Sequence, residues 1–222
     1  MPIMSLFTSP LMRKGIFFMP NSIKNNKHSE KTKYIVKISI LSALAAVIML
    51  LEFPLWFAPP FYEIDFSEIP ILIGAFSMGP LAGVLMEFLK NVLNLLMTGT
   101  TTAFVGELAN FITGCAFILP AAIIYKYKKT FLGAIIGMIA GILSLTLIGS
   151  LLNYFFIIPA FSKLYKLPIE SIISMGAEKN NLINDLKTFV ALAVAPFNLF
   201  KGTVCSLLVL PIYKRVSKIL SK

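Results

Sequence analysis

The chain has 222 residues, of which 57% are hydrophobic and only 14% are charged, and its mean hydropathy is +0.84. This apolar content exceeds that of soluble domains and excludes an ordinary water-soluble protein. The formal net charge of +10 does not indicate nucleic-acid binding, because the lysines and arginines concentrate in the tails and in one short connection between apolar runs. We therefore expect an all-α integral membrane protein that crosses the cell membrane several times.

The N-terminal part of the sequence consists of a polar stretch, one long apolar run and a loop. Residues 1–33 are expected to form a flexible cytoplasmic tail, and residues 34–222 a single membrane domain. The run over residues 35–51 is long enough to cross a bilayer and follows Lys31 and Lys33, so its start is predicted to be cytoplasmic. Residues 52–65 contain three prolines and five aromatic residues, which predicts an irregular outer loop rich in rings.

Five further helices complete a predicted bundle of six transmembrane helices. Ser67 is expected to cap a short helix over residues 69–78, which is too short to span upright and must be tilted or shielded by protein. The remaining apolar runs cover residues 81–97, 104–125, 131–158 and 188–213, and residues 159–187 form an outer connection. Lys214 and Arg215 follow the last run, so both termini are predicted to be cytoplasmic.

Polar residues inside the spans are the candidates for function. A charge at the centre of a span costs at least ~2.5 kcal/mol, so each one needs a partner or a ligand. Four of them share one helical face by their spacing, and the others lie in later spans: Glu87, Lys90, Asn91 and Asn94, then Glu107, Asn110, Asn153, Asn198 and Lys201. Together they predict an outward-facing polar cavity, roofed by the aromatic loop at residues 56–62. Such a cavity suits a flat heteroaromatic ring with a hydrogen-bonding tail better than an ion.

Structural interpretations of the same residues remain open. Glu87 with Lys90, and Glu107 with Lys201, are alternatively ion pairs that hold helices together, and the asparagines are interhelical hydrogen-bonding groups. A row of small residues on the first span fits either docking of a partner membrane subunit or packing inside the bundle: Ser39, Ser42, Ala43 and Ala46.

Enzymatic chemistry has little support in the sequence. The single histidine, His28, lies in the polar tail, and Cys115 and Cys205 lie in apolar runs without metal-ligand spacing. No phosphate-binding glycine-rich loop is present. We expect no enzyme, no metal site, no cofactor and no ATPase activity in this chain.

Ordered sequence blocks resemble the riboflavin-binding substrate-specific (S) components of energy-coupling-factor (ECF) vitamin transporters. The blocks lie at residues 62–70 (YEIDFSEIP), 79–83 (GPLAG), 87–91 (EFLKN), 98–102 (TGTTT), 106–111 (GELANF) and 196–202 (PFNLFKG). The resemblance implies capture of riboflavin, as a substrate, on the outer face of the membrane, with the aromatic loop as a lid. It also implies a transmembrane coupling protein and two ATPases as partners, besides the lipid bilayer, and assigns docking to the small-residue face of the first helix.

The resemblance also assigns ligand contacts by position. It implies vitamin contact first at Asn198 and Lys201, then at Asn153, and then at Tyr62, Glu63 and the loop Thr100, Thr101 and Thr102. Six more residues fall at family positions, and both ligand contact and helix support remain open for them: Glu87, Lys90, Asn91, Asn94, Glu107 and Asn110. Three alternatives remain: an S component for another vitamin, a proton-coupled secondary transporter using Glu87 or Glu107, and a membrane enzyme acting on a lipid.

Overall fold

The computed structural model describes the backbone of residues 22–220 and the side chains of residues 30–213. The chain divides into a first unit that ends at Ile35 and a second unit that begins at Val36. Helix α1 (Ser22–Met49) starts inside the segment predicted to be a flexible tail, and residues 1–21 of that tail lie outside the described residues. The second unit contains the rest of α1 and every later helix and strand.

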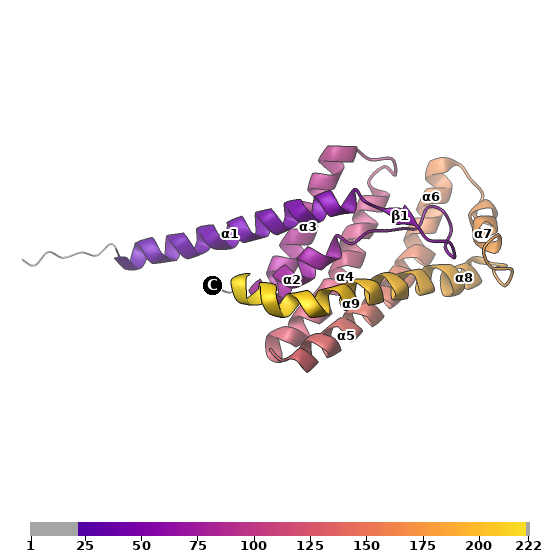
Figure 1. The fold of residues 1–222 in the computed structure, drawn as a ribbon. Coiled ribbons are helices and arrows are strands. Elements are labelled where there is room, and N and C mark those ends of the chain that lie inside the picture. Colours follow the sequence, from indigo (N-terminus) through magenta and orange to yellow (C-terminus); the bar gives the residue numbers. More distant parts are fainter. Residues whose placement is uncertain (1–21, 221–222) are drawn as a thin grey trace, which may run out of the picture. The chain divides into compact units, whose positions relative to one another are not determined.

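Within the described residues, five helical segments are long and apolar enough to cross a membrane, and one further apolar helix is shorter. The short helix is α2 (Glu68–Met78). The longer ones after α1 are α3 (Pro80–Thr98), α4 (Val105–Tyr127), α5 (Phe131–Leu152) with α6 (Ile158–Tyr165), and α8 (Leu186–Phe189) with α9 (Ala195–Leu220). This arrangement confirms the predicted all-α membrane bundle (Figure 1).

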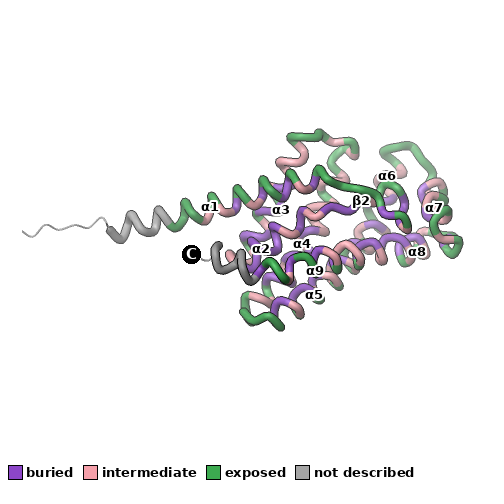
Figure 2. Tube along the Cα trace, viewed as in Figure 1, coloured by how far each residue is buried: buried purple, intermediate pink, exposed green. Residues whose placement is uncertain are grey.

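Helix α2 lies at the centre of the packing, as expected for an apolar helix that is too short to span the membrane upright. It contacts α3, α4 and α9, and most of its residues are buried (Figure 2). Large apolar side chains instead point outward from α3 and α5, including Leu81, Leu96, Leu143 and Leu147. Because lipid tails are as apolar as these side chains, the outward faces suit a bilayer and α2 is shielded by protein.

The start of α2 corrects one prediction. Ser67 precedes the helix, but its side chain makes no capping hydrogen bond, and its buried hydroxyl has no partner among the described residues. The Ser67 amide instead donates to Asp65 Oδ1 at 2.8 Å. The residue that stabilises this turn is therefore the aspartate two positions earlier.

The aromatic loop contains a small hairpin that the sequence did not indicate. Strand β1 (Phe53–Pro54) pairs antiparallel with β2 (Glu63–Ile64), so that Phe53 lies opposite Ile64 and Pro54 opposite Glu63. This register brings the two ends of the loop together close to the start of α2.

Within residues 22–220, two π-helical turns interrupt long helices shortly before a proline. Turn η2 (Asn153–Ile157) joins α5 to α6 and precedes Pro159, and turn η3 (Val190–Val194) joins α8 to α9 and precedes Pro196. A proline within a helix removes one hydrogen bond and clashes with the preceding turn, and a widened turn accommodates it. The two π turns contact each other, and each lies within about a turn of an asparagine predicted to bind ligand.

Helix α7 (Ile169–Ala177) lies in the predicted outer connection. It packs with α6 and α8 around a small apolar cluster that includes Ile172, Ile183 and Phe189. The outer connection is thus a folded cap next to the π turns.

Candidate functional site

A cavity of about 200 Å³ lies between the hairpin, α2, α4, the α5–α6 segment, α7 and α9. Its wall combines aromatic and aliphatic side chains with polar groups from segments far apart in the sequence. The polar residues that line it are Glu52, Tyr62, Glu63, Asp65, Glu68, Asn110, Thr113, Asn153, Asn198 and Lys201. This mixture of apolar walls and a few convergent polar groups is typical of small-molecule sites.

Six of the predicted ligand residues line this cavity: Tyr62, Glu63, Asn110, Asn153, Asn198 and Lys201. Tyr62 donates its hydroxyl hydrogen bond to Asn153 Oδ1 at 2.6 Å, and Asn153 Nδ2 donates to the Gly149 carbonyl at 2.9 Å. These bonds fix the Asn153 amide with its oxygen toward the loop. The neighbouring Asn198 is buried at the wall, and no hydrogen bond of its side chain is found within residues 30–213.

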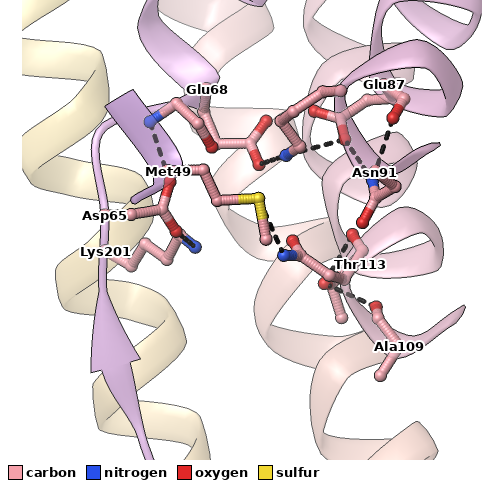
Figure 3. A network of polar contacts seen from close by, with 11 residues as sticks. Met49, Asp65, Glu68, Glu87, Asn91, Ala109, Thr113 and Lys201 are labelled. Carbon is pink, nitrogen blue, oxygen red and sulfur yellow. Dashed lines mark hydrogen bonds and ion pairs between the residues drawn. The ribbon is translucent and has the colours of Figure 1, made fainter. Parts of the chain in front are cut away.

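Lys201 is held by a residue that the sequence-based prediction missed. Its ammonium lies 2.8 Å from Asp65 Oδ2, while Asp65 Oδ1 accepts from the Ser67 amide (Figure 3). Burial alone raises the pKa of Asp65, but the nearby ammonium groups, above all Lys201, hold that pKa below its usual range. The pair joins the hairpin to α9 across 136 positions of sequence. The alternative interpretation that paired Lys201 with Glu107 does not hold, because Lys201 pairs with Asp65 and Glu107 accepts from Thr102 Oγ1 at 2.9 Å.

A second set of buried charges lies beside the cavity. The Lys90 ammonium lies 2.9 Å from Glu68 Oε1 and 2.9 Å from Glu87 Oε2, and the lysine side chain is 0% exposed. Asn91 Nδ2 donates to the Glu87 carbonyl at 2.9 Å (Figure 3). Of these four residues only Glu68 lines the cavity. The geometry therefore favours helix support over ligand contact for Lys90 and Asn91.

The threonine loop and Asn94 are also placed away from the cavity wall. Thr102 Oγ1 accepts from the Gly106 amide at the start of α4, and Thr100 Oγ1 accepts from the Phe104 amide. The Thr101 carbonyl accepts from the Tyr165 hydroxyl, and Asn94 accepts from Thr98 on its own helix. These contacts shape the turn into α4, so none of these four predicted residues contributes to the wall.

The aromatic loop covers the cavity only with its second half. Phe61 and Tyr62 line the cavity, whereas Trp56 does not and is 77% exposed. The Trp56 ring packs edge-on against Phe57 and against Phe200 of α9, at centroid distances of 5.3 and 6.5 Å. Of the roof predicted over residues 56–62, only Phe61 and Tyr62 therefore line the cavity.

Comparison with known proteins decides the family. The family described as "ECF transporter, substrate-specific component" matches residues 33–213, which is most of the chain. This chain is an S component. It is 34% identical over 193 residues to "Riboflavin transporter RibU" of Staphylococcus aureus (strain TCH60), with 87% of this chain and 95% of that protein covered. It is 38% identical over 175 residues to "Riboflavin transporter FmnP" of Bacillus subtilis (strain 168), with 78% and 86% covered.

A solved structure supports the same assignment. It is described as "Structure and mechanism of the S component of a bacterial ECF transporter" and matches this S component with a TM-score of 0.68 at 33% identity. The match covers 86% of this chain and 99% of the other. Fold and family therefore agree over most of the chain.

The small-residue row on α1 of this S component splits between two faces. Ser42 and Ala46 are buried, with exposed fractions of 0% and 1%, whereas Ser39 and Ala43 are exposed. The Ser42 hydroxyl donates to the Ile38 carbonyl of its own helix. The docking prediction is therefore wrong for Ser42 and Ala46 in this conformation, because the bundle itself covers them. For Ser39 and Ala43 it stays a prediction.

Proposed function

We propose that this S component captures riboflavin at the outer face of the membrane for ATP-driven uptake. The observation that carries the proposal is the cavity itself, in which three asparagines and a lysine meet among aromatic walls. The names of the related transporters from S. aureus and B. subtilis support riboflavin over other vitamins. The chain then acts as a transport subunit rather than an enzyme, and riboflavin is its substrate rather than a cofactor.

The chemistry of riboflavin matches the wall in two ways. Its flat tricyclic ring suits the aromatic side chains of Phe61, Phe117 and Phe197, because offset or edge contacts between rings add to simple burial. Its pyrimidine edge alternates carbonyl and N–H groups, and an asparagine amide offers one acceptor and two donors. We assign this edge to the side-chain amide of Asn198, which makes no hydrogen bond within residues 30–213. The second N–H of Asn153 Nδ2, beside the one that donates to Gly149, is assigned to the same edge. Lys201 and Asp65 then face the ribityl hydroxyls.

Charge distribution supports an outward-facing cavity. Lys31 and Lys33 lie at the start of the span of α1, Lys126 lies in the last turn of α4, and Lys128 and Lys129 lie in the turn between α4 and α5. Positively charged residues stay on the cytoplasmic side, so the hairpin that follows α1 belongs outside. In this orientation both termini are cytoplasmic and Glu52, Tyr62 and Glu63 lie at the extracellular end.

We expect the hairpin to move when riboflavin enters the cavity. Its volume of about 200 Å³ is below the roughly 300 Å³ at which sites for drug-sized ligands begin. The hairpin is the wall segment with least regular structure, since its strands have only two residues each. We expect it to shift outward as riboflavin enters and to close through Tyr62 and Asp65, whose partners lie on η2 and α9.

The family implies an ECF transmembrane coupling protein and two ATPases as partners. The exposed α1 residues Ser39 and Ala43 offer small side chains that permit close approach of another helix. We assign docking of the coupling protein to this face.

Loss of the Tyr62 hydroxyl tests the closed hairpin. Tyr62→Phe keeps the ring but removes the hydrogen bond to Asn153. A typical hydrogen bond contributes about 0.5–1.5 kcal/mol, so riboflavin affinity should fall by about 2- to 10-fold in an equilibrium titration. Tyr165→Phe is the matched control, since that hydroxyl bonds Thr101 outside the cavity. An equal loss in both variants would contradict the role given to Tyr62.

Uptake by reconstituted vesicles tests the proposed function. The chain is inserted in proteoliposomes with and without the coupling protein and the two ATPases, and entry of labelled riboflavin is measured. The proposal predicts uptake that needs all partners and ATP and that persists when the proton gradient is collapsed. Uptake by the chain alone, driven by a proton gradient, would instead establish the secondary-transporter alternative.

A further inference from the structure

Gly149 lies near the end of α5, where that helix packs against α9 and against both π turns. It is buried and is not among the described residues that line the cavity. Its carbonyl nevertheless accepts a hydrogen bond from Asn153 Nδ2 at 2.9 Å, and the backbone N–H of Asn153 donates to the same oxygen. The Asn153 side chain is therefore fixed to its own helix, about one turn earlier.

The missing side chain of Gly149 makes room for the second asparagine. A β-carbon at this position would lie 2.6 Å from Asn198 Nδ2 and 3.2 Å from Asn198 Cγ. Carbon atoms in contact prefer a separation of about 3.5–4.0 Å. The three nearest atoms outside this stretch of α5 all belong to the Asn198 side chain. Any residue larger than glycine would therefore push the Asn198 amide away from its observed place.

One buried glycine thus contacts two amides of the cavity wall. No hydrogen bond of the Asn198 side chain is found within residues 30–213, so packing, including the contact with Gly149, sets where its amide lies. Polar groups of a binding site need to be held to within about 0.5 Å. We propose that Gly149 is a positioning residue for riboflavin, which holds Asn153 and Asn198 at the spacing needed to bind the pyrimidine edge. The inference rests on the proposed function and adds the residue that arranges its two asparagines.

The variant Gly149→Ala isolates the contact with Asn198. Alanine keeps the backbone carbonyl, so the bond from Asn153 remains, and alanine is the better helix former, so α5 itself is not weakened. The added methyl group must displace the Asn198 amide. One hydrogen bond is worth about 2- to 10-fold in affinity, and the amide offers both a donor and an acceptor to the ring edge. We expect riboflavin binding to weaken by about 5- to 50-fold, measured by equilibrium titration.

Gly202→Ala is the matched control. Gly202 is buried on α9, which packs against the same helix, and a β-carbon there would lie 3.1 Å from Ile142 Cγ1 and 3.3 Å from Leu145 Cδ2. The added methyl group is again tightly placed, but its neighbours are apolar. This variant should bind riboflavin as the wild type does, even if its melting temperature falls.

A modified ligand separates positioning from a general loss of structure. Methylation of riboflavin at N3 replaces the N–H of the pyrimidine edge, so the wild type should bind riboflavin more tightly than the methylated ligand. Gly149→Ala should lose most of this preference, because the displaced amide no longer faces the edge. A loss of stability alone would weaken both ligands equally and leave the ratio of the two dissociation constants unchanged, as expected for Gly202→Ala.

The double variant Gly149→Ala/Asn198→Ala completes the test. Asn198→Ala removes all three atoms that the added methyl group would meet, so the double variant should fold and melt like Asn198→Ala alone. Its riboflavin affinity should also equal that of Asn198→Ala, because Gly149 acts through that amide. This comparison holds even if Gly149→Ala alone is unstable.

Four results would overturn the inference: wild-type affinity or an unchanged ligand ratio in folded Gly149→Ala, an equal loss of affinity in Gly202→Ala, losses that multiply in the double variant, or a double variant that does not fold. A wild type that binds riboflavin while one of these results is found leaves the proposed function intact. A wild type that does not bind riboflavin refutes both.

Discussion

Replacing Lys201 with methionine is expected to weaken riboflavin binding by about 10- to 100-fold. Hydrogen bonds to charged groups contribute about 1.5–3 kcal/mol, and the Lys201 ammonium is the only cation on the described cavity wall. The substitution keeps the length of the side chain but removes the donor and leaves Asp65 without its partner. The change is measured as the dissociation constant for riboflavin, by quenching of flavin fluorescence on binding.

A second variant separates loss of contact from loss of folding. Asp65→Asn/Lys201→Met removes both charges of the pair, so no buried carboxylate is left unpaired. We expect it to restore thermal stability relative to Lys201→Met while riboflavin binding stays weak. Lys179→Met removes an exposed lysine of the outer connection and should change neither quantity. Wild-type affinity in a folded Lys201→Met/Asn198→Ala protein would reject the site.

Replacing Lys90 with methionine is expected to destabilise the fold by about 3–5 kcal/mol. Its ammonium is fully buried between Glu68 and Glu87, and removing one partner leaves uncompensated charges in a low dielectric. For a chain of this size the loss corresponds to a fall in melting temperature on the order of 10 °C. The midpoint of thermal unfolding in detergent measures it.

Neutralising the whole cluster should reverse most of this loss. Glu68→Gln/Glu87→Gln/Lys90→Met replaces three charges by neutral groups of similar size, and such replacements are often close to neutral for stability. We expect its melting temperature to lie well above that of Lys90→Met. A Lys90→Met protein that melts like the wild type and has lost riboflavin binding would show instead that Lys90 contacts the ligand.

The membrane spans were predictable because each one is a continuous apolar run bounded by prolines, glycines or charges. The predicted short helix over residues 69–78 differs by one residue from α2, and its shielding followed from its length alone. The π turns were not predicted, since hydropathy does not distinguish a helix widened before Pro159 or Pro196 from a regular one. The hairpin was missed because its strands are only two residues long.

The site was predictable in its residue types but not in its pairings. Asn153, Asn198 and Lys201 stood out because polar groups are costly inside apolar spans. The partner of Lys201 depends on the rotation of α9 and the path of the loop, and neither is encoded in local spacing. Asp65 could have been suspected from its place three residues before Glu68 in an acidic segment next to a span. The split of Ser39 and Ser42 onto different faces of α1 likewise required the packing itself.

Riboflavin binding by the isolated chain tests the central claim most directly. The protein is purified alone in detergent from cells supplied with riboflavin, its visible spectrum is recorded, and the ligand-free form is titrated with riboflavin and with other vitamins. Capture of riboflavin in the cavity predicts a yellow protein and saturable binding of one riboflavin per chain, with no competition from unrelated vitamins. A colourless protein that does not bind riboflavin, or that binds another vitamin in its place, would contradict it.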